Sequence, residues 1–261
     1  MNDVTIAILV KDKETVLKNF LHCIYNQTYD KKHINLYIRT NDNKDKSEEI
    51  LTNFIDEHRD EYKEIYYNSE SVDDNLKQYD NHEWNTLRFK ILGEIRQDSV
   101  NWALSRDSFY FVVDVDNFIM PDTLQHLINV NLPVISPMLM STTLYSNFHA
   151  AVDINGYFAN SDHYRNIYYK NIKGIIEMPV VHCTYLINKN ILNEIIYDDG
   201  SNRYEYVIFS DVLRKKNIPQ YLDNRYDYGI ITFWVTSEEM KTDIINCPYY
   251  SDFFSKYIIK S

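Results

Sequence analysis

The chain has few cysteines, no long apolar run and no excess of basic residues, and each absence excludes a class of protein. Its three cysteines, Cys23, Cys183 and Cys247, lack metal-type spacing and cannot all pair within one chain, so no disulfide framework is expected. No window approaches the roughly 20 apolar residues of a membrane helix. No basic segment followed by an apolar one opens the chain, so we expect a soluble protein without a signal peptide. The net charge of −11 argues against non-specific nucleic-acid binding.

Glycine and proline are also scarce, at 5 and 6 of 261 residues. The sequence has no Gly-x-Gly-x-x-Gly turn, which argues against a dinucleotide-binding fold of that type. It has no Pro- or Gly-rich linker and no internal repeat, so we expect a single domain.

Apolar runs alternate with helical patterns over residues 1–120. Strands are predicted at 4–10, 34–39, 65–67 and 109–113, and helices between them at 16–24, 50–55 and 87–102. This alternation predicts an α/β fold with a mostly parallel central sheet flanked by helices. The second half is less regular, with strands expected at 134–138, 145–153, 179–187, 220–222 and 230–235 and a helix over 203–216.

The most informative stretch is residues 109–117, in which an apolar strand leads directly into Asp114 and Asp116. Side chains alternate along a strand, so the two acids are expected to point the same way at its tip. Paired carboxylates with open coordination positions suit Mn²⁺ or Mg²⁺ bound to phosphate oxygens. Ligands in open α/β sheets bind beyond the carboxyl ends of the strands. The stretch therefore predicts a metal–diphosphate site for a nucleotide-sugar donor, with Val115 and Asn117 as donor contacts. Because Asp-x-Asp is common in surface turns, a structural turn is the alternative.

Other donor contacts follow from the same rule. Val10, Lys11, Thr40 and Asn43 come just after the first two strands and are expected to face uracil and ribose, with ordinary turn chemistry as the alternative for Thr40 and Asn43. Arg88 and Arg96 are eight residues apart on a helix, and either could bind the diphosphate or form an ion pair. Arg96 is preferred. Trp84 could stack on the uracil or belong to the core.

Several ordered blocks of the sequence resemble those of a known family, the GT-A nucleotide-sugar transferases of the collagen-modifying group, glycosyltransferase family 25. These blocks are Trp84, Arg88-Phe89, Ile95-Arg96-Gln97, residues 111–117, Pro121–Leu124, Val134–Leu139, Tyr145–Phe148, Asn155–Tyr157 and Met178–Ile187. The resemblance covers roughly residues 4–230. It implies a GT-A-like fold with a nucleotide-sugar half (1–120), an acceptor half (121–236) and a C-terminal segment (237–261) serving as a lid or homodimer contact.

The resemblance implies transfer of a hexose from a UDP-sugar to collagen hydroxylysine, with Mn²⁺ or Mg²⁺ as cofactor. We favour glucose from UDP-glucose onto galactosylhydroxylysine because of a likeness to a viral member of this group. Galactose from UDP-galactose onto hydroxylysine, or a non-collagen acceptor, is the alternative. The expected partners are therefore the UDP-hexose and the collagen-like acceptor, with neither nucleic acid nor membrane, in the cytoplasm or a virion.

The resemblance also implies roles for residues in the second half. A third metal ligand is expected there, and Asp223, after a short strand, is the candidate, although a turn or helix cap explains it equally well. His182 would position acceptor or phosphate instead of being an ordinary core histidine. Glu205, where the family has an acid, would be the general base of an inverting transfer or would orient the acceptor in a retaining one. A helix-dipole role competes, and Asp198 and Asp199 are substitutes.

Overall fold

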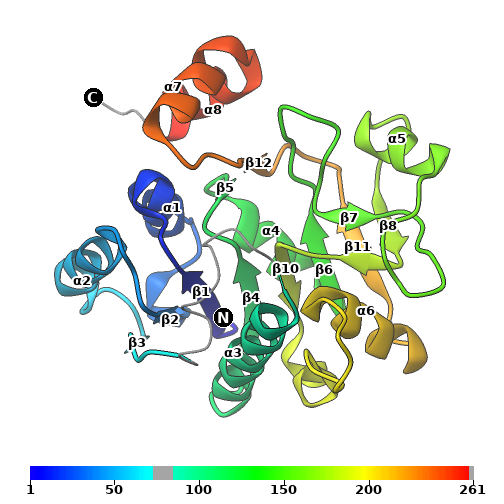
Figure 1. Cartoon of the computed structure of the whole chain (residues 1–261), viewed down its shortest axis with the longest axis horizontal. Helices are drawn as coiled ribbons and strands as arrows, with labels where there is room; N and C mark the ends of the chain where they lie inside the picture. Colours follow the sequence, from blue (N-terminus) through cyan, green and yellow to red (C-terminus); the bar gives the residue numbers. More distant parts are fainter. Residues whose placement is uncertain (73–84, 259–261) are drawn as a thin grey trace.

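The computed structural model describes residues 1–72 and 85–258. Within these ranges, eight strands form one central sheet in the order β3-β2-β1-β4-β10-β6-β11-β8 (Figure 1). The strands of this sheet are β1 (Val4–Val10), β2 (Ile34–Thr40), β3 (Glu64–Asn68), β4 (Phe109–Val113), β6 (Val134–Pro137), β8 (Ile175–Met178), β10 (Thr184–Ile187) and β11 (Gln220–Asp223). Two small sheets pair β5 (Asn117–Ile119) with β12 (Gly229–Ile231) and β7 (Phe148–His149) with β9 (Val180–Val181).

Helices cover both faces of the sheet. They are α1 (Glu14–Tyr25), α2 (Ser47–His58), α3 (Thr86–Leu104), α4 (Thr123–Val130), α5 (Asp162–Tyr168), α6 (Glu205–Lys215), α7 (Ser237–Asn246) and α8 (Pro248–Tyr257), with 3₁₀ turns at Lys31–His33 and Lys189–Glu194. Strands β3, β2, β1 and β4 run parallel, and β6 and β11 share their direction, whereas β10 and β8 run antiparallel to their neighbours. The predicted α/β class with a mostly parallel sheet is confirmed.

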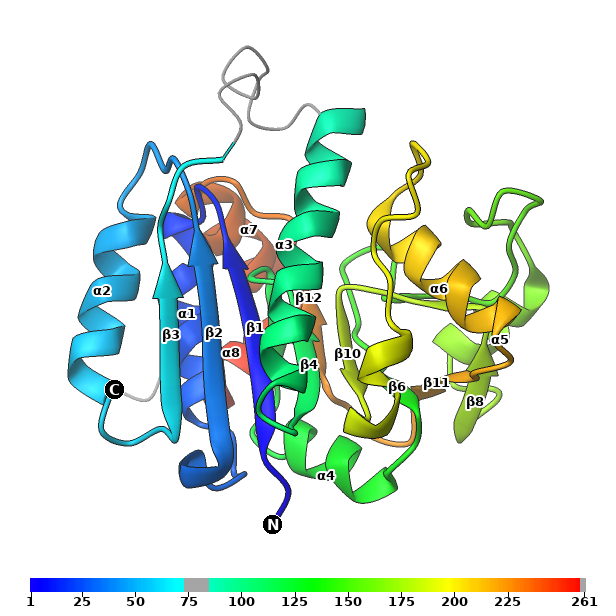
Figure 2. The ribbon, with the colours of Figure 1, turned by 90° about the horizontal axis from the view of Figure 1, so that it is seen from below.

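Alternation along the strands divides the core between the two faces of the sheet. On β4, Phe109, Phe111 and Val113 pack with α1, α2, α4 and α8 on one face, whereas Tyr110 and Val112 pack with α3, α5 and α6 on the other. Figure 2 shows α3 crossing the sheet face away from α1 and α2. Strands β1, β2 and β4 are rich in apolar residues because both of their faces are buried, whereas the edge strand β3 is partly exposed.

The second half departs from the predicted strands. The expected strand 179–187 is broken: β9 ends at Val181, Cys183 has a φ of 62°, and β10 begins at Thr184. A left-handed residue reverses the side-chain alternation that a continuous strand would have. The expected strand 145–153 is reduced to β7. The elements α5 and β8 were not predicted, because residues 162–178 have no clear period.

The C-terminal helices belong to the core of the first half. Tyr250, Phe253 and Phe254 of α8 are buried, and Phe254 packs edge-on against Phe118 and beside Trp234. A role of this segment as a lid or dimer contact stays a prediction. No helix within the described residues has the length and apolar character needed to span a membrane.

Candidate active site

The two acids predicted from the sequence sit in a tight turn at the end of β4. The strand stops at Val113, and the N–H of Asn117 donates to the carbonyl oxygen of Asp114 at 2.9 Å. The buried strand before the acids is confirmed. The argument from strand alternation does not hold, because the chain turns between Asp114 and Asp116 instead of continuing as a strand.

Both carboxylates reach solvent, and each contacts one cation. The side chains of Asp114 and Asp116 are 32% and 28% exposed. Arg96 donates through Nη2 to Oδ1 of Asp114 at 2.8 Å, and Lys13 Nζ lies 3.2 Å from Oδ2 of Asp116. Burial raises the pKa of Asp116, Lys13 opposes that shift, and the charge of Asp114 adds to it. The two acids therefore interact electrostatically and share one site.

Elements of the second half hold this turn in place. The N–H and hydroxyl of Thr232, just after β12, donate to the carbonyl oxygen of Asp116 at 2.9 and 3.0 Å. The N–H of Asp114 donates to the carbonyl of Cys183 at 2.9 Å. Gly229 is required where β12 meets β5, because a Cβ there would collide with the carbonyl oxygen of Phe118.

The side chains of Val115 and Asn117, two residues predicted as donor contacts, face inward. Val115 is buried in the core beneath the turn. The amide of Asn117 is fully buried and donates to Thr184 Oγ1 at 2.8 Å, while its Oδ1 has no partner among the described residues. The expectation for these two residues is corrected: their side chains support the turn, and only their backbone could approach a donor.

Arg96 links Asp114 to Glu205 inside the protein. The residue is 5% exposed, and its Nε lies 3.6 Å from Oε1 of Glu205 without forming a hydrogen bond. Burial alone would lower the pKa of Arg96, but the carboxylates of Asp114 and Glu205 raise it well above its usual range. The guanidinium is thus committed to two protein acids, which corrects its predicted role as a direct diphosphate contact.

Glu205 begins α6 and is the acid that the structure brings to this site. It is 6% exposed, and burial raises its pKa, with Arg96 opposing and Asp114 adding to the shift. The proposed substitutes serve local structure instead. Asp198 accepts from the N–H of Gly200, and Asp199 pairs with Arg203 at 2.6 Å. A buried carboxyl with a raised pKa suits proton transfer near neutral pH.

His182 lies beside the broken strand in a cluster of rings. It is 3% exposed, and its ring centroid lies 5.1 Å from those of His149 and Tyr206 and 5.8 Å from that of Tyr145. Its Nδ1 lies 2.9 Å from the sulfur of Cys183, and its Nε2 has no partner among the described residues. Burial and then His149 lower its pKa well below the usual value, so the ring is neutral.

Three neighbours of this cluster, Cys183, His149 and Tyr206, were not predicted. Burial raises the pKa of Cys183, and the charges of Asp114 and Asp116 add to the shift, so the side chain is a thiol next to the acidic turn. The available signal for Cys183 was its place within the Met178–Ile187 block, next to His182. Nothing in the local sequence marks His149 or Tyr206.

The loops after β1 and β2 meet, and their side chains bind each other. Their contact with uracil and ribose stays a prediction. Thr40 Oγ1 donates to the carbonyl of Val10 at 2.9 Å and accepts from Asn43 Nδ2 at 2.6 Å. Asn43 Oδ1 in turn accepts from the N–H of Asp12 at 2.9 Å. Lys11 Nζ reaches the carbonyl oxygens of the second loop at 3.1 and 2.7 Å. Burial lowers the pKa of Lys11, Asp12 and Asp42 oppose that shift, and Lys44 and Arg88 add to it.

Asp223 is not brought to the acidic turn. It is fully buried, accepts from Arg225 Nη2 at 2.7 Å and from the Tyr228 hydroxyl at 2.7 Å, and so has its donors already. Across residues 1–72 and 85–258, no three His, Cys, Asp or Glu side chains are grouped closely enough to hold a metal ion. The expectation that Asp223 is a third ligand is corrected on this placement. Trp84 lies outside the described residues.

Comparison with known proteins identifies relatives over most of the chain. A family model described as "Glycosyltransferase family 25, N-terminal domain" matches residues 1–246. A "Glycosyltransferase 25 family member" of Drosophila melanogaster is 31% identical over 192 residues, which are 72% of this chain and 31% of that protein. "Procollagen galactosyltransferase 2" of Homo sapiens is 28% identical over 241 residues, 87% of this chain and 38% of that protein. The chain spans less than half the length of these relatives.

Solved structures share the fold at low sequence identity. TarS of S. aureus in complex with UDP-GlcNAc superposes with a TM-score of 0.57 and 13% identity, over 89% of this chain and 59% of that one. GalNAc-T7 with UDP, GalNAc and Mn²⁺ superposes with a TM-score of 0.60 and 13% identity, over 97% and 50%. These likenesses show that the sheet described above is a GT-A glycosyltransferase fold.

Proposed function

The chain belongs to glycosyltransferase family 25, and we propose that it transfers a hexose from a UDP-sugar to the hydroxylysine glycans of a collagen-like acceptor. The observation that carries the proposal is the turn at the end of β4, where Asp114 and Asp116 reach solvent within a fold of the GT-A type. The acceptor is taken from the name of relatives such as the human procollagen galactosyltransferase.

The residues present fit a divalent cation. Asp114 and Asp116 offer hard oxygen ligands that are one-third exposed and electrostatically coupled. Mn²⁺ or Mg²⁺ bound by one or two carboxylates keeps further positions for phosphate oxygens and water. Such a cation, when bound, neutralises the charge that develops on the departing UDP. The absence of a third grouped acid among the described residues is consistent with this open coordination.

Three cations of the first half, Lys11, Lys13 and Arg88, are our candidates to bind the diphosphate. Lys13 contacts Asp116, and Lys11 follows β1 within electrostatic reach of Arg88. We assign these three side chains to donor binding in place of Arg96, whose charge is taken up by Asp114 and Glu205. Because Thr40 and Asn43 hold the two loops together, their contribution to uracil and ribose binding is the shape of that edge and its backbone groups.

The acceptor side is formed by α6 and the broken strand. Glu205 keeps a raised pKa in a buried position, so it can accept the proton of an acceptor hydroxyl if the transfer inverts configuration, or orient that hydroxyl if it retains. His182 is neutral, and its Nε2 has no partner among the described residues, so it can exchange a hydrogen bond with the acceptor. Arg96 keeps Asp114 and Glu205 at fixed separation.

Two donors are in question. The sequence resemblance favours glucose added to galactosylhydroxylysine. The names of the relatives favour galactose added to hydroxylysine, which is the second candidate. We also keep three expectations from the sequence as part of the proposal. The protein is similar to a viral member of the group, it forms a homodimer, and it acts in the cytoplasm or is carried in a virion.

The experiment is a matrix of two donors and two acceptors. The full chain is incubated with Mn²⁺ and UDP-glucose or UDP-galactose, and with collagen-type peptides carrying bare or galactosylated hydroxylysine. UDP release and peptide mass are followed, with EDTA as the metal control. We expect one donor–acceptor pair to gain a single hexose in a metal-dependent way. If no pair reacts while the protein is folded and binds UDP, the acceptor assignment is wrong; if it does not bind UDP either, the transferase assignment is wrong.

A further inference from the structure

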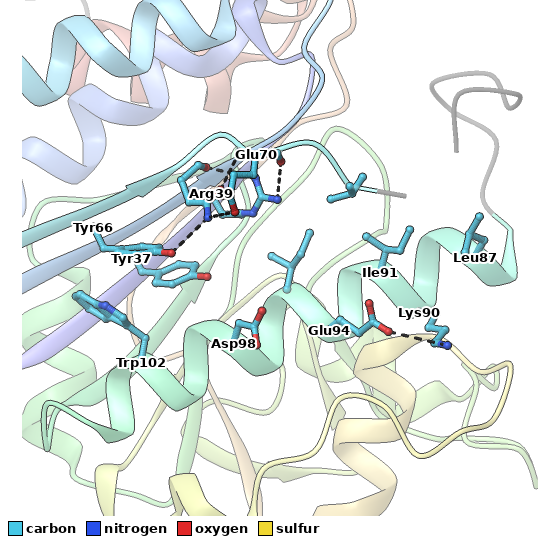
Figure 3. Close-up of a pocket in the computed structure, with 13 residues that line it drawn as sticks. Tyr37, Arg39, Tyr66, Glu70, Leu87, Lys90, Ile91, Glu94, Asp98 and Trp102 are labelled. Atoms are coloured by element: carbon cyan, nitrogen blue, oxygen red, sulfur yellow. Dashed lines mark hydrogen bonds and ion pairs between the residues drawn. The ribbon is translucent and has the colours of Figure 1, made fainter. Parts of the chain in front are cut away.

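A cavity lies on the opposite side of α3 from Arg96. It has a volume of about 460 Å³ and opens between α3 and the strands β2 and β3 (Figure 3). Its α3 wall is formed by Ile91, Ile95, Asp98 and Trp102, which recur at helical spacing along one stripe. Arg96 and the other buried residues of α3 lie on a different stripe, packed toward the acidic turn and α6. The cavity is therefore separate from the proposed transfer site.

The floor of the cavity is a rigid cluster of three aromatic rings. Tyr37 of β2 stacks on Tyr66 of β3 with a centroid distance of 4.9 Å, and Trp102 lies 5.7 and 5.9 Å from these two rings. The guanidinium of Arg106 covers Trp102 at 3.6 Å and is fixed by two hydrogen bonds to Glu64, of 2.8 and 2.7 Å. Rings held in this way offer apolar contact area at little cost in side-chain entropy.

Two acids of α3 at the cavity, Glu94 and Asp98, are weakly paired within the described residues. Asp98 forms no hydrogen bond or ion pair with another residue of the described ranges, and the partner of Glu94 is Lys90 at 4.0 Å, the limit of an ion pair. The nearest guanidinium, Arg39, donates to main-chain carbonyls, including that of Glu70 at 2.7 Å, and not to these carboxylates. Figure 3 shows both acids on α3 beside the aromatic floor.

We propose that this cavity docks an extended, proline-rich peptide segment bearing Lys or Arg. Pyrrolidine rings in the polyproline II conformation pack on Tyr and Trp faces and lose little chain entropy on binding. A basic side chain beside them pairs with Asp98 and Glu94, because the lining carries three acids (Glu70, Glu94 and Asp98) against two bases (Arg39 and Lys90). A free sugar fits less well, because the wall includes Leu87, Ile91 and Ile95, and the neutral amide present, Asn68, is already bonded to Glu70 at 3.0 Å.

The test measures binding of a labelled peptide to the full chain by fluorescence anisotropy. The peptide is proline-rich with two lysines. It is compared with a proline-free peptide of equal charge and with a proline-rich peptide without lysine. We expect the first to bind tightest and to weaken as NaCl rises from about 50 to about 500 mM. Glu94→Gln/Asp98→Asn should weaken it about fivefold, because two charge pairs are lost. Both acids are exposed, so the variant should fold normally.

The matched control is Glu49→Gln/Asp56→Asn on α2, which changes the net charge equally on the other side of the sheet and should leave binding unchanged. Trp102→Leu should weaken both proline-rich peptides, with circular dichroism to verify the fold. Equal binding of the proline-free peptide, no effect of the α3 variant, displacement of the peptide by free glucose or galactose, or no binding at all would each overturn the proposal.

Discussion

Two parallel strands, β4 and β11, reach the same edge of the sheet and lead into acidic residues, yet the carboxylates at the two ends have opposite surroundings. In sequence the ends look alike, since Asp116-Asn117 and Asp223-Asn224 both follow apolar strands. In the structure Asp223 is fully buried, whereas Asp114 and Asp116 are about one-third exposed. The same sequence pattern therefore serves structure at one end and leaves acids open to a ligand at the other.

The supply of nearby donors accounts for the difference. Asp223 receives hydrogen bonds from Arg225, two residues along the chain, and from Tyr228. Although burial opposes the shift, these bonds lower the pKa of Asp223. At the other end, burial raises the pKa of Asp116, and Lys13 does not offset it. Acids held at such a cost to stability are the ones expected to have a function.

The largest expected effect is the loss of turnover on Asp116→Ala. If the β4 end holds the cation at the diphosphate, this variant should lower turnover about a thousandfold, because a transition-state charge loses its stabilisation. The melting temperature should be unchanged or higher, since the replaced acid is destabilised in the folded protein. Hexose transfer and thermal unfolding measured on one preparation check both statements. Turnover within tenfold of wild type would mean that Asp116 at the end of β4 is not needed for transfer.

The opposite variant, Asp223→Ala, should lower stability and spare turnover. It leaves Arg225 and the Tyr228 hydroxyl without their acceptor, at a cost of about 2–3 kcal/mol, below the value for a fully buried pair because Arg225 is partly exposed. That corresponds to roughly 5–10 °C in melting temperature. Urea unfolding measures the free energy, and Asp227→Ala, at an exposed pair with Lys170, is the control with little expected change. An unchanged stability with a raised Mn²⁺ requirement would return Asp223 to the metal site.

Much of the first half could be predicted from sequence. The apolar runs 4–10, 34–39 and 109–113 are unambiguous because strands buried on both faces admit few polar residues. The position of Asp114 and Asp116 followed from the third run. The location of Val10, Thr40 and Asn43 at the ends of the first two strands could be predicted. The direction of the Thr40 and Asn43 side chains could not, because hydrogen bonds between the two loops decide it.

The rest of the site depends on tertiary structure that the sequence hides. Cys183 adopts a left-handed conformation without the glycine or asparagine that usually signals one, so the break between β9 and β10 could not be seen. From sequence, Arg96 was a candidate to bind phosphate because arginine pairs readily with phosphate. Only the position of α6 in the structure shows that Glu205 lies beside it. The helix α6 also begins without a side-chain cap, which removes the usual start signal.

A smaller effect is expected from the arginines that serve the two ends. Arg96→Gln removes the cation between Asp114 and Glu205 and should lower turnover about 10- to 100-fold, the range for residues that orient metal ligands. Arg96→Lys keeps the charge but not the planar fork, so it should restore only part of that loss. The matched variant Arg225→Gln should change stability instead. The Mn²⁺ concentration for half-maximal rate separates them, and equal behaviour of the two arginines would contradict the comparison.

The smallest expected effect concerns how stability depends on pH, where Asp223 and Glu205 should act with opposite sign. Asp223 has a lowered pKa, so its contribution is present above its unfolded pKa of about 3.9 and is lost as the pH falls through its folded value. Glu205 has a raised pKa, so its ionisation costs stability as the pH rises from about 4.3 toward its folded value.

Urea unfolding between about pH 3 and pH 7 tests this with Asp223→Asn and Glu205→Gln. Burial lowers the pKa of His149 to about 4, so wild type and both variants lose stability from this group as the pH falls from about 6.5. That loss cancels when each variant is subtracted from wild type. The difference curve of Asp223→Asn should then fall in size at low pH, whereas Glu205→Gln should gain stability over wild type at high pH. Curves of the same sign would mean that Asp223 and Glu205, the acid that shares Arg96 with Asp114 of the β4 end, are held for the same reason.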